Sequence, residues 1–259
     1  MRLDAALAGW VHSAFAWAGM AWGAAMWRAT LRRQATGGAL APGNFAVLVG
    51  LLLGAALGNK GVFLMERPDV ALALWQGQPV WPGQSIVGGL LGGLIGVEIA
   101  KTLTGQTRST GDAMVWPIAV GLAIGRIGCF LAGLHDDTYG LPTPLPWGVD
   151  FGDGIARHPT QLYEIAIVLP LGWALSRARF AMPGLAFKAF LCAYLLWRFF
   201  IEFLKPVPVA WPLGLSGIQY TCALALALYT PLVARAWRAE RPAVPSGDRP
   251  AYPPGKKHT

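Results

Sequence analysis

Charged side chains are scarce in this sequence, and that scarcity excludes an ordinary soluble domain. Asp, Glu, Lys and Arg make up 13% of the 259 residues, whereas 54% are hydrophobic and 12 are tryptophans. Soluble domains have roughly a quarter of their residues charged. Several windows reach the roughly 20 apolar residues that cross a bilayer as a helix. The composition therefore predicts an all-α, polytopic membrane protein.

Cysteine is rarer still. Cys129, Cys192 and Cys222 lie in or at the ends of apolar segments, with no short spacing between any two of them. This pattern excludes a disulfide framework and a zinc knuckle. No small-residue cleavage site follows the first apolar segment, so we expect residues 8–27 to remain in the protein as a membrane span.

Seven apolar segments predict seven transmembrane helices in one domain over residues 1–239. The predicted spans are residues 8–27, 44–65, 84–103, 112–132, 160–176, 184–204 and 214–234. The net charge of +8 lies mostly between and after the spans, which suits a positive-inside pattern better than a nucleic-acid site. We expect an outer N-terminus, an outer loop region at 134–160, and a disordered basic cytoplasmic tail at 240–259.

Arg126 stands where an apolar span meets the outer loop region, between Gly125 and Gly128. Its guanidinium group suits bidentate contact with a phosphate, and the two glycines would let a ligand reach the backbone. The alternative is a snorkelling arginine that only anchors the helix end. Cys129 follows three residues later, either as a buried inert thiol or as one whose pKa the arginine lowers.

A second polar group lies on the span at 184–204. Tyr194, Arg198, Glu202 and Lys205 follow one another at intervals of four, four and three residues, which places them on one helix face. Arg198 and Glu202 are spaced for an ion pair hidden from lipid. Alternatively, the whole face lines a cavity opposite Arg126, where its surplus positive charge suits an anion.

The segment Arg157–Glu164 opens the fifth predicted span. His158 precedes a proline and is either a loop hydrogen-bonding residue or a proton acceptor. Glu164 lies one turn into the apolar part, so we expect an arginine partner, for which Arg126, Arg157 and Arg198 are the candidates.

Acidic residues gather in the outer loop region, where hard oxygen ligands suit a divalent cation. They are Asp136, Asp137, Asp150 and Asp153, with His135 beside them. Their spacing matches no metal motif, so a solvated acidic loop is the preferred interpretation and no metal is expected.

Glycines recur every three or four residues between Gly88 and Gly96, and Gly89 adds to this small-residue face. A helix face without side chains lets another backbone approach closely within the membrane. We therefore expect the third predicted span to pack tightly against a neighbouring helix.

Four of these blocks together resemble the prolipoprotein diacylglyceryl transferases: Gly125–Phe130, the glycine-rich Ser85–Gly92, Arg157–Glu164 and Tyr194–Lys205. The resemblance runs from the first span to the last. It implies a bacterial inner-membrane enzyme with a periplasmic N-terminus and a cytoplasmic C-terminus. Such an enzyme transfers the diacylglyceryl group of phosphatidylglycerol, or a similar anionic phospholipid, to a preprotein lipobox cysteine and releases glycerol phosphate. We expect a monomer with no cofactor and no nucleic-acid partner.

The resemblance also implies roles for individual residues. Arg126, Arg198 and Glu202 are expected to be catalytic, with His158 or His135 as the proton acceptor. The residues expected to bind the substrate are Gly88, Gly89, Asp112, Gly125, Gly128, Cys129, Arg157, Glu164, Tyr194 and Lys205.

Several positions depart from the family pattern. Valine stands at 87 in place of the family histidine, and Cys129 and Ala132 replace two asparagines. Lys205 replaces an arginine, and Ala18 replaces a tyrosine. The phosphate-binding residues are kept while the suggested base is lost, which predicts a divergent paralogue that acts on the lipobox thiol or on another acceptor.

Two other classes of function remain open at this point. A non-catalytic phospholipid-binding or lipid-moving protein would use the same cationic cavity. An ion-coupled transporter would use Glu164 and Glu202, but no internal repeat supports it.

Overall fold

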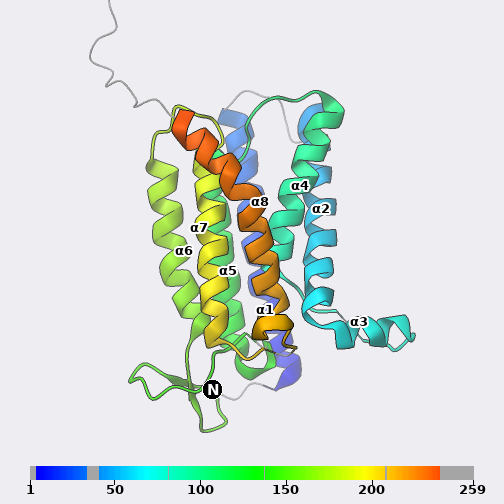
Figure 1. Ribbon diagram of the computed structural model, residues 1–259, viewed down its shortest axis with the longest axis vertical. Coiled ribbons are helices and arrows are strands. Elements are labelled where there is room, and N and C mark those ends of the chain that lie inside the picture. Colours follow the sequence, from blue (N-terminus) through cyan, green and yellow to red (C-terminus); the bar gives the residue numbers. More distant parts are fainter. Residues whose placement is uncertain (1–3, 34–40, 81, 137, 208, 240–259) are drawn as a thin grey trace, which may run out of the picture.

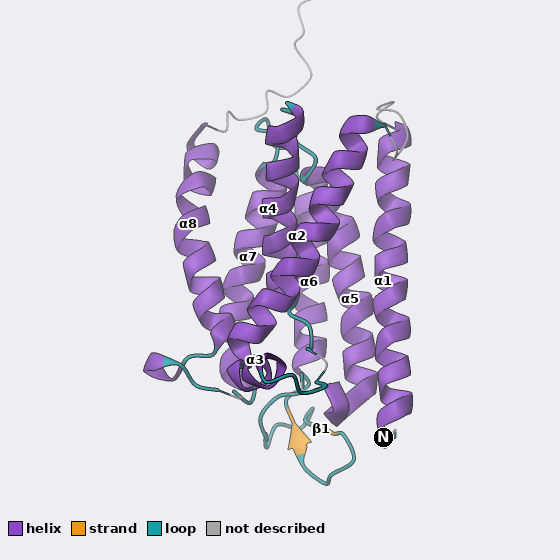
Figure 2. Ribbon diagram, turned by 90° about the vertical axis from the view of Figure 1, so that its right-hand side faces the viewer, coloured by secondary structure: helices purple, strands orange, loops and turns teal. Residues whose placement is uncertain are grey.

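The protein is a bundle of long helices, seen in a computed structural model that describes residues 4–33, 41–80, 82–136, 138–207 and 209–239. Its α-helices are α1 (Ala5–Arg33), α2 (Pro42–Glu66), α3 (Pro68–Trp75), α4 (Ile86–Thr104), α5 (Val115–Ala132), α6 (Thr160–Arg177), α7 (Leu185–Ile201) and α8 (Gly217–Ala239). All except α3 run roughly along one axis, side by side (Figures 1 and 2). The predicted tail at 240–259 lies outside the described residues.

Four segments are long and apolar enough to cross a membrane: Gly43–Glu66, Ile86–Thr104, Asp112–Asp136 and Gly217–Arg238. Large apolar side chains on the outside of the bundle are bare, as Leu57 and Leu103 show with exposed fractions of 75% and 81%. Contiguous apolar surface of this kind belongs against lipid. The chain is therefore an all-α membrane protein, as its composition predicted.

The ends of the helices are fixed by local polar contacts. The Oγ of Ser85 accepts a hydrogen bond from Gly88 N at 3.3 Å and so caps α4 at its first turn. Gly105 ends the same helix with φ of 68°, a left-handed conformation that glycine adopts without strain. Asp112 opens the short 3-10 helix η1 (Asp112–Met114) that leads into α5.

Glycines bring α2 and α4 into backbone contact. A Cβ atom added to Gly88 would lie 2.1 Å from the carbonyl oxygen of Gly58, and one on Gly92 would lie 2.2 Å from that of Gly54. The tight packing expected for the third span is thus confirmed, with α2 as the neighbour. The same contact places the bare face of Gly88 against α2, and the expected role of Gly88 in substrate binding stays a prediction.

The outer loop region contains regular structure that the sequence did not predict. Strand β1 (Val149–Asp150) pairs in antiparallel fashion with β2 (Ala156–Arg157). Leu141 N donates to the carbonyl oxygen of Leu204 at 2.8 Å, which ties the loop to the 3-10 helix η3 (Glu202–Leu204) after α7. Helix α3 lies between the second and third predicted spans. Both features lie at the end of the bundle where α1 begins (Figure 1).

We predict that Gly92→Ala destabilises the bundle by about 1–3 kcal/mol, because the added methyl group must push α2 away. The matched control is Gly61→Ala on α2, where an added Cβ meets nothing within 4 Å. The control should keep or slightly raise the melting temperature, since alanine restricts the unfolded chain. Thermal unfolding of both variants in detergent measures the difference, and equal melting temperatures would contradict the packing argument.

Candidate active site

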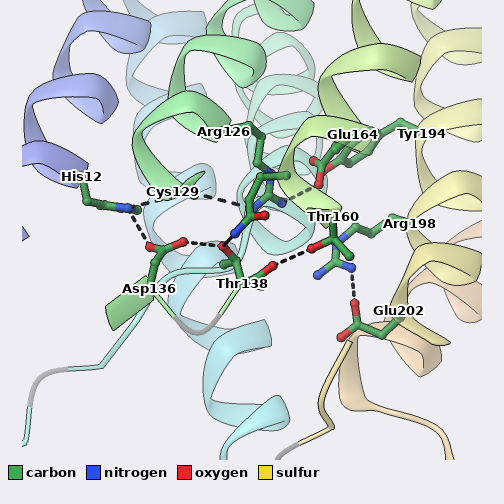
Figure 3. Close-up of polar contacts among 11 residues, drawn as sticks. His12, Arg126, Cys129, Asp136, Thr138, Thr160, Glu164, Tyr194, Arg198 and Glu202 are labelled. Atoms are coloured by element: carbon green, nitrogen blue, oxygen red, sulfur yellow. Dashed lines mark hydrogen bonds and ion pairs between the residues drawn. The ribbon is translucent and has the colours of Figure 1, made fainter. Parts of the chain in front are cut away.

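Arg126 lies in the last two turns of α5, buried among three helices. Its Nη2 atom is 2.8 Å from Oε2 of Glu164 on α6. The hydroxyl of Tyr194 on α7 donates to Oε1 of the same carboxylate at 2.9 Å. Figure 3 shows these side chains converging from α5, α6 and α7. The arginine partner expected for Glu164 is therefore Arg126.

The two glycines beside Arg126 have different surroundings. A Cβ on Gly125 would meet nothing within 4 Å, so the backbone there is open. A Cβ on Gly128 would lie 2.6 Å from Cβ of Phe15, so this glycine admits α1. The expected binding role of Gly128 stays a prediction.

A second ion pair, Arg198 with Glu202, closes α7 four residues apart, as the spacing predicted. Tyr194, Arg198, Glu202 and Lys205 are all buried, so the polar face of α7 and its extension points into the bundle. Within the described residues Lys205 has no ion pair. It is the one cation of this group without a partnering carboxylate there.

Two buried polar atoms beside these pairs lack a hydrogen-bond partner among the described residues. They are Nε of Arg126 and Oε1 of Gln161, whose Nε2 donates to Oγ1 of Thr138 at 3.2 Å. Such atoms are uncommon in folded proteins because an unmade buried hydrogen bond costs about 1–3 kcal/mol. An unpaired N–H on a buried guanidinium group is suited to a ligand oxygen.

No sequence pattern indicated the third polar group of the site, which centres on His12 of α1. Its Nδ1 atom is 2.7 Å from Oδ1 of Asp136 and 3.8 Å from Sγ of Cys129. Cys129 in turn accepts a hydrogen bond from Nη1 of Arg126 at 3.9 Å. A lone histidine in an otherwise apolar first span was the available signal, but no spacing linked it to residues far along the chain.

The outer loop keeps two expected site residues apart from this cluster. His158 Nδ1 is 3.2 Å from the hydroxyl of Tyr163, and Arg157 forms a 2.7 Å ion pair with Asp153. The guanidinium group holds the pKa of the Asp153 carboxyl below its usual value. Neither His158 nor Arg157 makes a polar contact with Arg126 among the described residues, because the β1–β2 ladder directs this segment into its own hydrogen bonds.

Asp112 also lies away from Arg126, at the other end of α5 and roughly 20 Å along the helix. Its carboxylate accepts hydrogen bonds from Gly184 N at 2.5 Å and Phe187 N at 3.0 Å. It therefore caps the start of α7, and we assign it to the fold instead of the substrate site.

Gly89 lines a largely apolar cavity of about 1520 Å³ that α2, α4, α5, α7 and α8 enclose in part. On α5 the wall includes Leu122, which is four residues before Arg126 and so on the same helix face. The cavity extends from Gly89 to the end of the bundle where α5 begins, and the residues that line it do not include Arg126, Glu164 or Tyr194.

The sequence profile of the prolipoprotein diacylglyceryl transferases matches residues 10–235 of this chain. The chain belongs to that family. The resemblance inferred from the motifs is confirmed.

Several members of the transferase family are similar in sequence. A relative from Geobacter sulfurreducens is 34% identical over 172 residues, which cover 62% of this chain and 63% of the relative. Relatives from Rhizobium meliloti and Methylobacillus flagellatus are also 34% identical, over 71% of this chain and 67% and 68% of their own lengths. All three are named phosphatidylglycerol–prolipoprotein diacylglyceryl transferase. The match therefore spans less than two thirds of the first relative.

One departure from the transferase pattern lies directly beside the site. Val87, at the position where the resemblance leads us to expect histidine, is buried in the same apolar cluster as Tyr194. Valine has no proton acceptor, so any base for a reaction here must come from another helix.

We predict that Glu164→Gln destabilises the protein by about 3–5 kcal/mol, because it leaves the buried charge of Arg126 without a counter-ion. The double variant Arg126→Gln/Glu164→Gln should recover part of this loss, since it buries no unpaired charge. Asp153→Asn provides the comparison at an exposed ion pair and should have little effect. Urea or thermal unfolding in detergent tests the series, and equal losses for Glu164→Gln and Asp153→Asn would refute it.

Proposed function

We propose that this protein is a phosphatidylglycerol-dependent diacylglyceryl transferase that modifies a thiol of a prolipoprotein or a related acceptor. The observation that carries the proposal is the buried cationic cluster at Arg126, with its unpaired Nε atom. The buried charged residues of this cluster are Arg126, Arg198, Lys205, Glu164 and Glu202. Among these five residues, three cations against two carboxylates leave one positive charge, and Glu66, half-buried at the end of α2, lies at the edge of the cluster. A phosphodiester carries one negative charge and would balance the remaining positive charge.

The proposed setting is the bacterial inner membrane, crossed by seven helices, with the N-terminus in the periplasm and the C-terminus in the cytoplasm. In support, α1, α6 and α7 run alongside the four apolar segments (Figures 1 and 2). Basic residues stand in the last turns of α1, α4, α6 and α8, which end at the same side of the bundle. That side would face the cytoplasm under the positive-inside rule.

The cavity supports the same substrate class. Its apolar wall suits acyl chains, and on α5 it extends as far as Leu122, one helical turn before Arg126. Gly125, where the backbone is open, would leave room for the glycerol part of the lipid. We include Gly89, Tyr194 and Lys205 in this binding region as well.

In the proposed reaction the acceptor sulfur attacks the glyceryl carbon that carries the phosphate. A C–S bond forms, the C–O bond to phosphate breaks, and glycerol phosphate leaves with the electron pair. Arg126 and Arg198 would stabilise the charge on the leaving group. Glu164 and Tyr194 hold the Arg126 guanidinium in place, and Glu202 does the same for Arg198. The thiol proton passes to a base or to water.

The second candidate function is phospholipid binding or movement without chemistry, and Val87 is the observation that favours it. Both functions require a phosphate at Arg126. Only the transferase also requires an activated thiol within reach of the glyceryl carbon.

We predict that purified protein incubated with labelled phosphatidylglycerol and a lipobox peptide yields lipidated peptide and glycerol phosphate. Arg126→Gln should lower this rate by about 10²–10³-fold, the usual loss when a transition-state donor is removed. Arg177→Gln, at the far end of α6, is the matched control and should retain the rate. Lipid binding that is lost in Arg126→Gln, with no product from any thiol acceptor in the wild type, would support the binding protein and overturn the transferase.

Lys205 generates a pH prediction for the same site, because burial and the neighbouring Arg198 lower the pKa of its ammonium group to about 8. The charged groups that face it are Arg198, Glu202, Arg126, Glu164 and Glu66. Lys205 is protonated below pH 8 and loses its charge above it. Affinity for phosphatidylglycerol should then fall by up to about tenfold per pH unit above 8.

Lys205→Arg is the test of that assignment, since arginine stays charged throughout this range. The variant should bind phosphatidylglycerol with an affinity that changes little between pH 7 and 10, roughly the span between neutral pH and the ordinary lysine pKa. An alkaline loss of affinity that persists in Lys205→Arg would assign the titration to another group.

A further inference from the structure

His12, Cys129 and Asp136 bring three metal-ligating atoms together at the outer end of α1 and α5. Nδ1, Sγ and a carboxylate oxygen all lie within 4.8 Å of one another. The 3-10 helix η2 (Gly133–Asp136) turns the chain back after α5, so that Asp136 reaches the same point as Cys129 (Figure 3). Gly133, with φ of 64°, makes that turn possible.

One separation fits a small tetrahedral ion and a second comes within a small shift of it. Around Zn²⁺ a nitrogen and a sulfur ligand lie about 3.6 Å apart, and a nitrogen and an oxygen ligand about 3.3 Å. The observed distance from His12 Nδ1 to Cys129 Sγ is 3.8 Å. The distance from His12 Nδ1 to Asp136 Oδ1 is 2.7 Å, so these two side chains would separate by roughly 0.6 Å to admit the ion.

We propose that His12, Cys129 and Asp136 bind a Zn²⁺ ion and leave its fourth position open for the acceptor thiol. The role of the open position rests on the proposed transferase function, whereas the metal site itself does not. Three protein ligands with one open position are the arrangement of catalytic zinc sites, and a mixed nitrogen, sulfur and oxygen set suits this borderline-soft ion.

Charge and hydrogen bonding around the three ligands agree with this assignment. A Cys129 thiolate and an Asp136 carboxylate would together neutralise the ion, so it could lie beside Arg126, whose own charge is balanced by Glu164. The second oxygen of Asp136 accepts a hydrogen bond from Thr138 Oγ1 at 2.5 Å. Outer contacts of this kind orient metal ligands and strengthen binding.

The three ligands differ in exposure. The side chain of His12 is 33% exposed, whereas that of Asp136 is 9% exposed and Cys129 is buried. His12 is therefore the most accessible of the three ligands. Cys129 and Asp136 are more buried than His12, and Arg126 donates a hydrogen bond to Cys129.

This placement supplies the proton chemistry that Val87 cannot. A thiol that binds zinc loses its proton to water, and the resulting thiolate remains nucleophilic. It would attack the glyceryl carbon of a lipid whose phosphate is held by Arg126, forming C–S as C–O breaks. The electron pair leaves on glycerol phosphate, so one proton and one glycerol phosphate are released per thioether formed.

The test is a titration of the full-length, metal-free protein in detergent with Co²⁺, a spectroscopic substitute for Zn²⁺. We expect one equivalent to bind, with a sulfur-to-cobalt charge-transfer band that Zn²⁺ abolishes by competition. Cys129→Ser should remove the band, and His12→Gln should weaken binding at least about 100-fold. Cys192→Ser, on α7, is the matched cysteine control and should retain both.

Thr138→Ala provides a milder variant that keeps all three ligands. It should bind Co²⁺ about 10–100-fold more weakly, with a modest fall in melting temperature because the buried Gln161 Nε2 also loses its acceptor. Absence of the band in the wild type, or a band that survives Cys129→Ser, would overturn the metal site and leave His12 and Asp136 as a hydrogen-bonded pair.

Activity separates the metal site from the transferase proposal. One-equivalent Co²⁺ binding without product from any thiol would retain the metal site but reject both the transferase and the role of the open position. Transfer at full rate in protein that binds no Co²⁺ or Zn²⁺ would retain the transferase and reject the metal site. Transfer that requires Zn²⁺ and is lost in Cys129→Ser supports both.

Discussion

The ion pair between Arg126 and Glu164 is the interaction on which the site depends. A charge inside an apolar bundle is tolerated only when its partners are fixed and close. Glu164 satisfies this condition by accepting from Arg126 and Tyr194 at once, so a single carboxylate joins α5, α6 and α7. The Arg198–Glu202 pair completes the same polar interior. These ion pairs hold the Arg126 guanidinium group in place, so its unpaired Nε stays inside the bundle and away from water.

Glycines at the helix contacts allow the helices of the bundle to pack closely. Gly54 and Gly92 let α2 and α4 touch through their backbones, and Gly128 lets α1 approach α5 at Phe15. The second contact is also the one that brings His12 beside Cys129. Gly128 therefore serves both tight helix packing and the chemistry of the outer end, although the sequence pattern suggested ligand access for it.

Residue spacing predicted which side chains share one face of a helix, but it predicted few of the contacts between helices. The intervals from Tyr194 to Lys205 correctly gave a buried polar face and the Arg198–Glu202 pair, and the glycine repeat correctly gave close packing. The partner of Glu164 was left among three arginines because spacing does not measure distance across a bundle. His12 was missed for the same reason, as it stands 117 residues before Cys129. The short strands of the outer loop are too brief for any periodic signal.

Helix α3 bears on the depth of the site in the membrane. It leaves the bundle sideways directly after α2, and its Trp75 is 90% exposed (Figure 1). Tryptophans in such positions favour the level of lipid headgroups. Glu66, the last residue of α2, is thereby held at that level, close to Lys205 and Arg198. Helix α3 would thus set the depth of the site in the membrane. A phospholipid would then reach the cationic cluster without leaving its leaflet.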